Sequence, residues 1–225
     1  MNHIPVLVVM VLALSLCNLT AKLGGKSGGE SNSNSSSSNS STAPSTSGST
    51  SPSGSSGSAA SNEPVERPNP TSAQTAALEG GQTVNWDQQG ITWTLPKNWN
   101  KMSVGKEMFN WGGDNAFLIV NISALGDTFP MDAALQAAYT GAQTEYKNGK
   151  YEELRWLELD GLKGVQFREA MPEDPSGPRR LQWQAYRKYA GQIQLVNLIL
   201  STSGSNFAKH QDEFYAILYS TKIVH

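Results

Sequence analysis

A long serine-rich stretch limits where this chain of 225 residues can fold. More than half of residues 31–61 are serine, and most of the others are asparagine, threonine, glycine or proline. Such a segment buries too little apolar surface to offset the entropy lost on ordering, so we expect residues 22–82 to form a disordered tether. Regular apolar patterning is confined to residues 83–225, which is enough chain for one domain with its own core.

The residues that precede the tether are typical of an export signal. Residues 4–17 form an apolar run of about 14 residues, which suits a signal-peptide core and is shorter than the ~20 residues of a membrane-spanning helix. A buried core helix is the alternative, but the adjoining tether gives it nothing to pack against. We therefore predict a signal segment over residues 1–21 and an extracytoplasmic location for the domain.

The apolar run ends in residues 14–17, LSLC, which resemble the lipobox of bacterial lipoproteins. The resemblance implies that Cys17 becomes the first mature residue and carries a diacylglycerol group and usually a second acylation, such as a palmitate. Two or more chains are needed for a stable membrane anchor. Leu16 stands where that family has a small residue, and residues 1–3 contain no Lys or Arg. Cleavage near Ala21, releasing a soluble secreted protein, is the alternative.

Alternating apolar residues predict a series of strands in the domain. The first is residues 90–95, where three apolar residues alternate with two threonines. Further strands are expected over residues 108–111, 116–123, 152–159, 164–170, 179–189 and 192–202. Asp160-Gly161 and Ala190-Gly191 predict tight turns within two hairpins. Residues 193–200 are apolar on both faces, so we expect this strand to be central and covered by helices.

Apolar residues spaced by three and four positions predict two helices. The first begins near Thr128, a suitable N-cap, has Pro130 in its first turn and ends at Gly149. The second is capped by Ser205, and its inner face consists of Phe207, His210, Phe214, Ile217, Leu218 and Thr221. Strands, a helix, hairpin-linked strands and a closing helix together predict an α+β fold, a twisted, mostly antiparallel sheet flanked by helices.

This order of elements resembles the PsbP-like superfamily, which includes the extrinsic photosystem protein PsbP and the Ran-binding Mog protein. The similarity rests on residues 90–99 (GITWTLPKNW), 129–132 (FPMD), 159–164 (LDGLKG) and the helix over 207–223. The resemblance implies an α-β-α sandwich that serves binding and assembly, usually without catalysis. No residue of this chain matches a photosystem or Ran-binding site, so the resemblance assigns none.

The sequence of the domain shows no catalytic or metal-binding constellation. Nucleophilic catalysis needs a base beside the nucleophile, and His210 occupies a core position, so we expect it to be packed. A cleft that joined His210 to Glu169 or Asp212 would favour an enzyme. Glu152 and Glu153 face opposite sides of a strand and so form no pair. No cluster of His, Cys or carboxylates predicts a metal ion, and we expect no cofactor.

Six tryptophans are the other notable feature of the domain. Trp93 and Trp183 alternate with polar residues, which predicts core positions. Trp86, Trp99 and Trp111 lie in or beside loops. If exposed together, these three would stack on a sugar or anchor a partner protein. Packing of the loops onto the sheet is the interpretation that the frequent burial of aromatic residues in small cores favours.

These features predict an exported, lipid-anchored binding or assembly module without catalysis. Its expected partners are the membrane, through Cys17, and a protein. The net charge of −2 and the absence of a basic stripe argue against nucleic acid. Since Cys17 is the only cysteine, the domain has no disulfide. The alternative function is a secreted sugar- or ligand-binding module that uses Trp86, Trp99 and Trp111.

Overall fold

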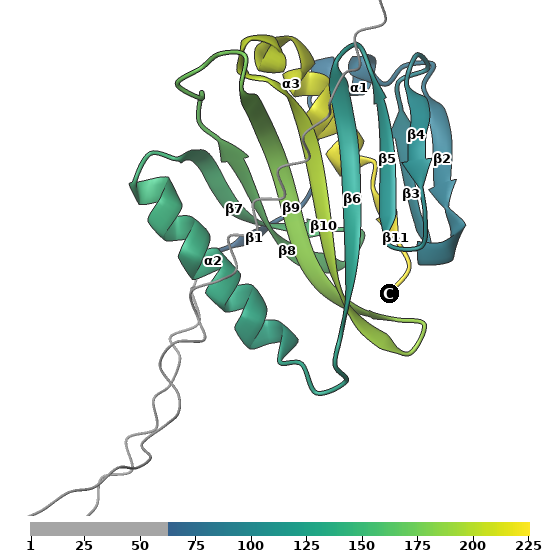
Figure 1. Cartoon of the computed structure of the whole chain (residues 1–225), viewed down its shortest axis with the longest axis vertical. Coiled ribbons are helices and arrows are strands. Elements are labelled where there is room, and N and C mark those ends of the chain that lie inside the picture. The colour runs from purple at the N-terminus through teal and green to yellow at the C-terminus, as the bar shows by residue number, and fades with distance from the viewer. Residues whose placement is uncertain (1–62) are drawn as a thin grey trace, which may run out of the picture. The chain divides into compact units, whose positions relative to one another are not determined.

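The computed structural model describes residues 63–225, which contain two β-sheets and three α-helices (Figure 1). The strands are β1 Val65–Glu66, β2 Gln82–Trp86, β3 Ile91–Leu95, β4 Asn100–Val104, β5 Met108–Gly113, β6 Ala116–Leu125, β7 Tyr151–Leu159, β8 Leu162–Glu169, β9 Pro178–Tyr189, β10 Gln192–Ser203 and β11 Lys222–Ile223. The helices are α1 Ser72–Ala77, α2 Met131–Lys147 and α3 Gly204–Tyr219. The predicted signal segment with Cys17, and the tether up to residue 62, lie outside the described residues.

Residues 63–82 belong to the folded domain and not, as their composition predicts, to the tether. Residues of β1 pair in parallel with Trp156 and Leu157 of β7. The helix α1 begins with a capping box, in which the Thr71 hydroxyl accepts from the backbone N–H of Gln74 and the Gln74 side chain accepts from the backbone N–H of Thr71. The helix packs against α3. The predicted domain start at residue 83 is therefore too late.

The large sheet has eight strands in the order β1-β7-β8-β9-β10-β6-β5-β4. Its two predicted hairpin turns are present, because Asp160, Gly161, Ala190 and Gly191 all have positive φ angles, as the tight primed turns require. The strand β10 pairs with β9 on one side and β6 on the other, so its predicted central position is correct.

On one face of the large sheet, α2 packs on β7, β8 and β9. Its Tyr139 ring stacks on Trp156, with ring centroids 4.3 Å apart. The helix begins later than predicted, with Pro130 rather than Thr128 at the N-cap position. Gly149, with a φ of 76°, follows its end as expected.

On the opposite face, α3 and the small sheet enclose the main hydrophobic core. The small sheet has the order β11-β3-β2, and its Trp93 ring lies 4.6 Å from that of Phe109 in the large sheet. Trp93 and Trp183 are fully buried, as predicted. The predicted inner face of α3 is buried too, although the N-cap is Ser203 and not Ser205.

The structure confirms the α+β class and the mostly antiparallel sheet, since β1–β7 is the one parallel pair in the described residues. Four strands lie at places where no strand is expected from the sequence, namely β1, β2, β4 and β11. Two of them, β1 and β11, have only two residues each, and so carry no periodic signal.

Candidate functional site

The three loop tryptophans do not form an exposed platform. Trp86 and Trp99 are each 1% exposed, and the Trp86 indole donates a hydrogen bond to the Gly105 carbonyl (2.9 Å). Trp111 is half-buried and stacks on Phe109, with ring centroids 6.0 Å apart. Trp86 and Trp99 fill the main core, so they are not available to stack on a ligand. For Trp86 and Trp99 the structure agrees with packing of the loops onto the sheet, and it contradicts a joint binding platform of Trp86, Trp99 and Trp111.

His210 is buried in α3, with 4% of its surface exposed. Its Nδ1 atom lies 3.1 Å from Glu213 Oε1, and its Nε2 atom lies 4.0 Å from Asp114 Oδ2. Burial raises the pKa of Glu213, and its hydrogen bond with His210 acts in the opposite direction. Neither Glu169, which pairs within the large sheet, nor the exposed Asp212 joins His210. The histidine is thus held by Glu213 through Nδ1, while its buried Nε2 atom has no hydrogen-bond partner in the described residues.

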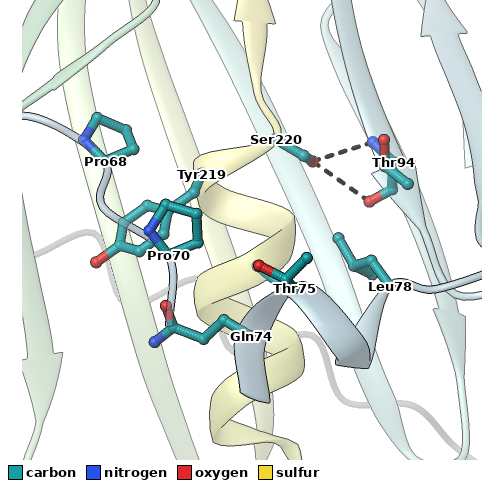
Figure 2. A pocket seen from close by; sticks show the side chains of 9 residues that line it. Pro68, Pro70, Gln74, Thr75, Leu78, Thr94, Tyr219 and Ser220 are labelled. Atoms are coloured by element: carbon teal, nitrogen blue, oxygen red, sulfur yellow. Dashed lines mark hydrogen bonds between the residues drawn. The ribbon is translucent and has the colours of Figure 1, made fainter. Parts of the chain in front are cut away.

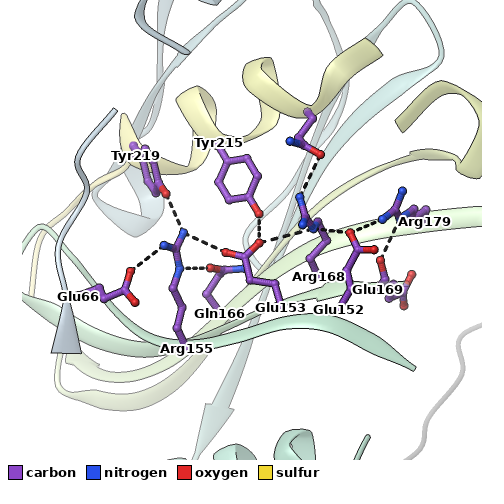
Figure 3. A network of polar contacts seen from close by, with 11 residues as sticks. Glu66, Glu152, Glu153, Arg155, Gln166, Arg168, Glu169, Arg179, Tyr215 and Tyr219 are labelled. Atoms are coloured by element: carbon purple, nitrogen blue, oxygen red, sulfur yellow. Dashed lines mark hydrogen bonds and ion pairs between the residues drawn. The ribbon is translucent and has the colours of Figure 1, made fainter. Parts of the chain in front are cut away.

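A network of arginine and glutamate side chains lies between the large sheet and α3 (Figure 3). Arg155 of β7 donates to Glu66 of β1 (2.8 Å) and to the Tyr219 hydroxyl of α3 (2.7 Å). It also contacts Glu153 and Gln166 on the sheet itself. One side chain therefore joins β1, β7, β8 and α3.

The other end of the network contains two carboxylates that a regular strand would separate. A register shift between Tyr151 and Glu153 produces a bulge in β7. As a result Glu152 and Glu153 both reach Arg168, whose Nε atom lies 2.7 Å from Glu152 and 3.5 Å from Glu153. The prediction that the two face opposite sides and form no pair is wrong for this reason. Tyr215 donates to Glu153, and burial raises the pKa of its hydroxyl.

The charges of this network are balanced among its own members. The cations are Arg155, Arg168, Arg179 and Arg180, and the carboxylates are Glu66, Glu152, Glu153 and Glu169. Half-buried ion pairs of this kind fix elements relative to one another and leave no free charge for a ligand. The network therefore connects β1, β7, β8, β9 and α3, and each of its charges already has a partner.

A small cavity lies beside the network, between α1 and α3 (Figure 2). Its volume is about 250 Å³, and Pro70, Leu78 and Tyr219 form part of its mostly apolar wall. Ligand pockets usually measure ~300–1,000 Å³ and contain several free polar groups. Here the Ser220 hydroxyl accepts from the Thr94 backbone N–H (3.0 Å), so it is already engaged. The cavity is a weaker candidate than the sheet surface described next.

Within residues 63–225, no helix covers one face of the large sheet over β5, β6, β10 and part of β9. Along β6 and β10 fully buried residues alternate with half-buried ones, and the half-buried set points away from α3. Figure 1 shows α2 on the β7–β9 part of the sheet and no helix over β6 and β10 on that side. We refer to this surface as the open face; its residues are Asn110, Phe117, Ile119, Asn121, Gln182, Gln184, Leu195, Asn197 and Ile199.

The open face corrects one expectation about β10. The apolar residues on both sides of this strand predict helices on both sides, but Leu195 and Ile199 are only half-buried. The physical reason is the position of α2, which packs on the three neighbouring strands β7, β8 and β9 and leaves β10 without a helix on that side of the described sheet.

Strand register arranges the open face in rows that cross the strands. One row is Met108, Asn121, Asn197 and Gln184. The next row is Asn110, Ile119, Ile199 and Gln182. Neighbouring strands lie about 4.8 Å apart, so each row presents one side chain per strand at that spacing.

The nine residues of the open face carry amides or apolar side chains. On the same side of the sheet, Arg180 lies in the row of Phe117 and Ser201, where it pairs with Glu169. Within residues 63–225, the side-chain amides of Asn121, Asn197 and Gln184 make no hydrogen bond. The Oδ1 atom of Asn110 is buried and has no hydrogen-bond partner either. A buried polar group without a partner costs free energy, whereas the half-buried amides of Asn121, Asn197 and Gln184 are open to solvent. These amides are therefore available to hydrogen-bond a ligand in place of water.

A glycine on the next strand determines how Phe117 lies at one end of the open face. A Cβ atom at Gly112 would lie 2.9 Å from Cδ1 of Phe117 and 3.3 Å from Sδ of Met102. Both side chains therefore lean over Gly112, an arrangement in which an aromatic ring covers a glycine on a neighbouring strand. Met102 is 56% exposed, so this end of the open face is apolar and accessible.

Among residues 63–225, no group of three or more His, Cys, Asp and Glu side chains could hold a metal ion. None of the described helices combines the length and hydropathy needed to cross a membrane.

Neither a family model nor a curated protein matches the sequence. Solved structures do match, over 64% of this chain. Cyanobacterial PsbP from Synechocystis sp. PCC 6803 is 14% identical, with a TM-score of 0.46 and 92% of its chain covered. LpqN of Mycobacterium tuberculosis, involved in cell envelope biogenesis, is 16% identical, with a TM-score of 0.45 and 90% covered. The Ran-binding protein Mog1p of Saccharomyces cerevisiae is 12% identical, with a TM-score of 0.37 and 95% covered.

The chain is similar in structure to this PsbP, to LpqN and to Mog1p, each at a TM-score below 0.5. It spans only 49% of a further similar chain, from Bacteroides thetaiotaomicron VPI-5482, which is 11% identical with a TM-score of 0.42. These similarities concern the arrangement of the elements alone, and they transfer no ligand and no site residue to this chain.

The sequence contains one signal for the open face, which the prediction from the tryptophans did not use. Asn121 and Asn197 each interrupt an otherwise apolar strand, at positions that a core would fill with Val or Ile. A polar residue in the middle of a central strand indicates a face that is exposed or that binds a polar ligand.

Proposed function

We propose that this chain is an exported binding or assembly module without catalysis, anchored to a membrane by a lipid on Cys17 and binding its partner through the open face. The apolar run over residues 4–17 and the uncharged serine-rich stretch over residues 31–61 support export and tethering. The observation that carries the binding function is the row of unpaired amides on an uncharged, half-exposed sheet face. A secreted soluble form, cleaved near Ala21, is the alternative to the anchored one.

Replacing Cys17 by Ser is expected to move the protein from the membrane fraction to the soluble fraction. A thioether-linked diacylglycerol with a further acyl chain gives stable anchoring, and serine cannot form that thioether. Fractionation of cells expressing each form, with the mass of the mature N-terminal peptide, measures the effect. Retention of the Cys17→Ser protein in the membrane fraction, unchanged from the wild type, would rule out the lipid anchor and leave export alone.

A charge placed on the open face is expected to abolish binding. Ile199 lies in the middle of the open face. In Ile199→Glu, an uncharged ligand that binds there would remove water from the new carboxylate, and this desolvation costs free energy. The matched control is Gln192→Glu, an exposed position on the same strand whose side chain points to the other side of the sheet. Cell-envelope material that is crosslinked to the wild type should be absent from Ile199→Glu and present with Gln192→Glu. Equal recovery with both variants contradicts a binding role for this face.

A further inference from the structure

We infer that the ligand of the open face is an extended, uncharged glycan that lies across strands β6, β10 and β9. This inference rests on the proposed function, because it names the ligand class of the same surface. Three observations support it: the spacing of the amide row, the absence of charge, and the apolar row beside the amides.

The amide row has a repeat that suits a linear sugar polymer. Asn121, Asn197 and Gln184 lie directly opposite one another on three adjacent strands. Successive strands are about 4.8 Å apart, which is close to the length of one pyranose unit in an extended glycan. A chain of sugars running across the strands would therefore meet one amide per sugar.

The chemistry of the row matches hydroxyl groups. Each side-chain amide has both a donor and an acceptor, and each sugar hydroxyl also donates and accepts, so the two pair in either direction. The amides of Asn121, Asn197 and Gln184 have no other hydrogen bond within the described residues. The buried Oδ1 of Asn110 also lacks a partner, and rotation of that amide toward a hydroxyl would pair it.

The electrostatics of the open face argue against charged ligands. Its nine residues are all uncharged, whereas nucleic acids and acidic polymers need cationic side chains to neutralise them. The nearest charges on this side of β9 are Arg180, which lies in the row of Phe117 and is neutralised by Glu169, and the exposed Lys188 at the end of the strand. A neutral ligand is the one that this surface can bind without leaving a charge unpaired.

The apolar residues of the open face suit the C–H faces of sugar rings. Ile119 and Ile199 are opposite each other in the row next to the amides, and Phe117 lies one row further along β6. Apolar and amide side chains in adjacent rows let one sugar ring contact hydrocarbon on one edge and hydrogen-bond on the other. A small number of precisely placed polar groups on a mostly apolar surface is typical of small-ligand sites.

The test uses the full chain, purified in detergent, and calorimetric titration with hexasaccharides of β-1,4-linked glucose, xylose or mannose. The variants are the double substitution Asn121→Ala/Asn197→Ala and the nearly isosteric Asn197→Asp, with Gln192→Ala as the control on the opposite side of β10. We expect the double variant and Asn197→Asp to bind about ten-fold or more weakly, since each lost amide removes one or two hydrogen bonds. Gln192→Ala should bind as the wild type does. Thermal melting of each variant shows that it is folded.

Three outcomes would overturn the inference. One is that none of the hexasaccharides binds at millimolar concentration, and another is that the amide variants bind them as tightly as the wild type does. The third is a wild-type dimer that Asn121→Ala/Asn197→Ala dissociates in light scattering, which would assign the open face to a second copy of the chain. Each of these is distinguishable from failure of the proposed function, because the crosslinking comparison of Ile199→Glu with Gln192→Glu depends on no particular ligand.

Discussion

Replacing Arg187 by Ala is expected to lower the free energy of unfolding by about 4 kcal/mol. Arg187 is 1% exposed on β9, and it donates to the Gln89 carbonyl (2.8 Å) and the Val224 carbonyl (2.9 Å). It also donates to Gln194 Oε1 (3.1 Å), and its guanidinium lies over the Tyr189 ring at 4.3 Å. Its removal leaves these acceptors unpaired and opens a void in the core.

All of the acceptors around Arg187 are uncharged, so its charge is held by hydrogen bonds rather than by an ion pair. Burial lowers the pKa of the guanidinium to about 10, which leaves it protonated at neutral pH. Because the folded pKa lies below the unfolded value, the cost of burying this charge is fully present below pH 10 and falls only above it. The destabilisation caused by Arg187→Ala should therefore be constant between about pH 6 and pH 9.

Urea unfolding measures this prediction, with Arg180→Ala as the matched control on the same strand. The Arg180 side chain is 38% exposed and pairs with Glu169, so its loss is expected to cost less than about 1 kcal/mol. Arg187→Lys should recover part of the lost stability, because lysine keeps the charge but cannot reach several acceptors at once. Similar unfolding midpoints for Arg187→Ala and Arg180→Ala would show that the buried guanidinium does not connect these elements.

A second large effect is expected at Gly164, where Gly164→Ala should destabilise the domain by about 3 kcal/mol. A Cβ atom there would lie 2.5 Å from two atoms of the Trp183 indole and 2.7 Å from the Gln184 carbonyl. Trp183 is fully buried, and its indole donates to the Leu157 carbonyl (3.0 Å), so it cannot move without breaking that hydrogen bond. The clash must therefore be relieved by shifting β8 away from β9.

The control for Gly164 is another glycine in a regular element. Gly141 lies on the exposed side of α2, and a Cβ atom there meets nothing within 4 Å. Gly141→Ala should therefore stabilise the domain by about 1 kcal/mol, the helix preference of alanine over glycine. Thermal unfolding of both variants compares them, and effects of the same sign at the two sites would contradict this account.

The helices and strands with strong apolar periodicity could be predicted from the sequence. Which elements pack on each face of the large sheet could not. The hairpins around Asp160 and Ala190 follow from local turn chemistry, and the buried side of α3 follows from spacing. The partial covering of β10 depends on where α2 packs, and no residue of β10 encodes that. Trp86 and Trp99 are buried because a small second sheet packs on the first, and the sequence shows only that they lie near loops.

The sequence does carry a local signal for α1, but the linker-like composition around it favoured a tether. Thr71 and Gln74 have the spacing of a capping box, which marks the start of α1 inside a stretch that resembles a linker. The strand β1 has two residues, and its pairing with β7 is a tertiary contact that no periodicity indicates. Likewise the bulge beside Glu153 changes which side chains meet, and it is a property of the paired strands.

The short parallel pair of β1 and β7 also determines how the domain would respond to a mechanical load at residue 63. Such a load passes first through the two residues of β1 and through the ion pairs Glu66–Arg155 and Arg67–Glu158, before it reaches the long strands of the sheet. These few, partly exposed contacts are the weakest in the path, so under tension residues 65–78 would detach first while the main core stays folded. Detachment would expose the apolar side of α3 around Tyr219 and would leave the open face unchanged.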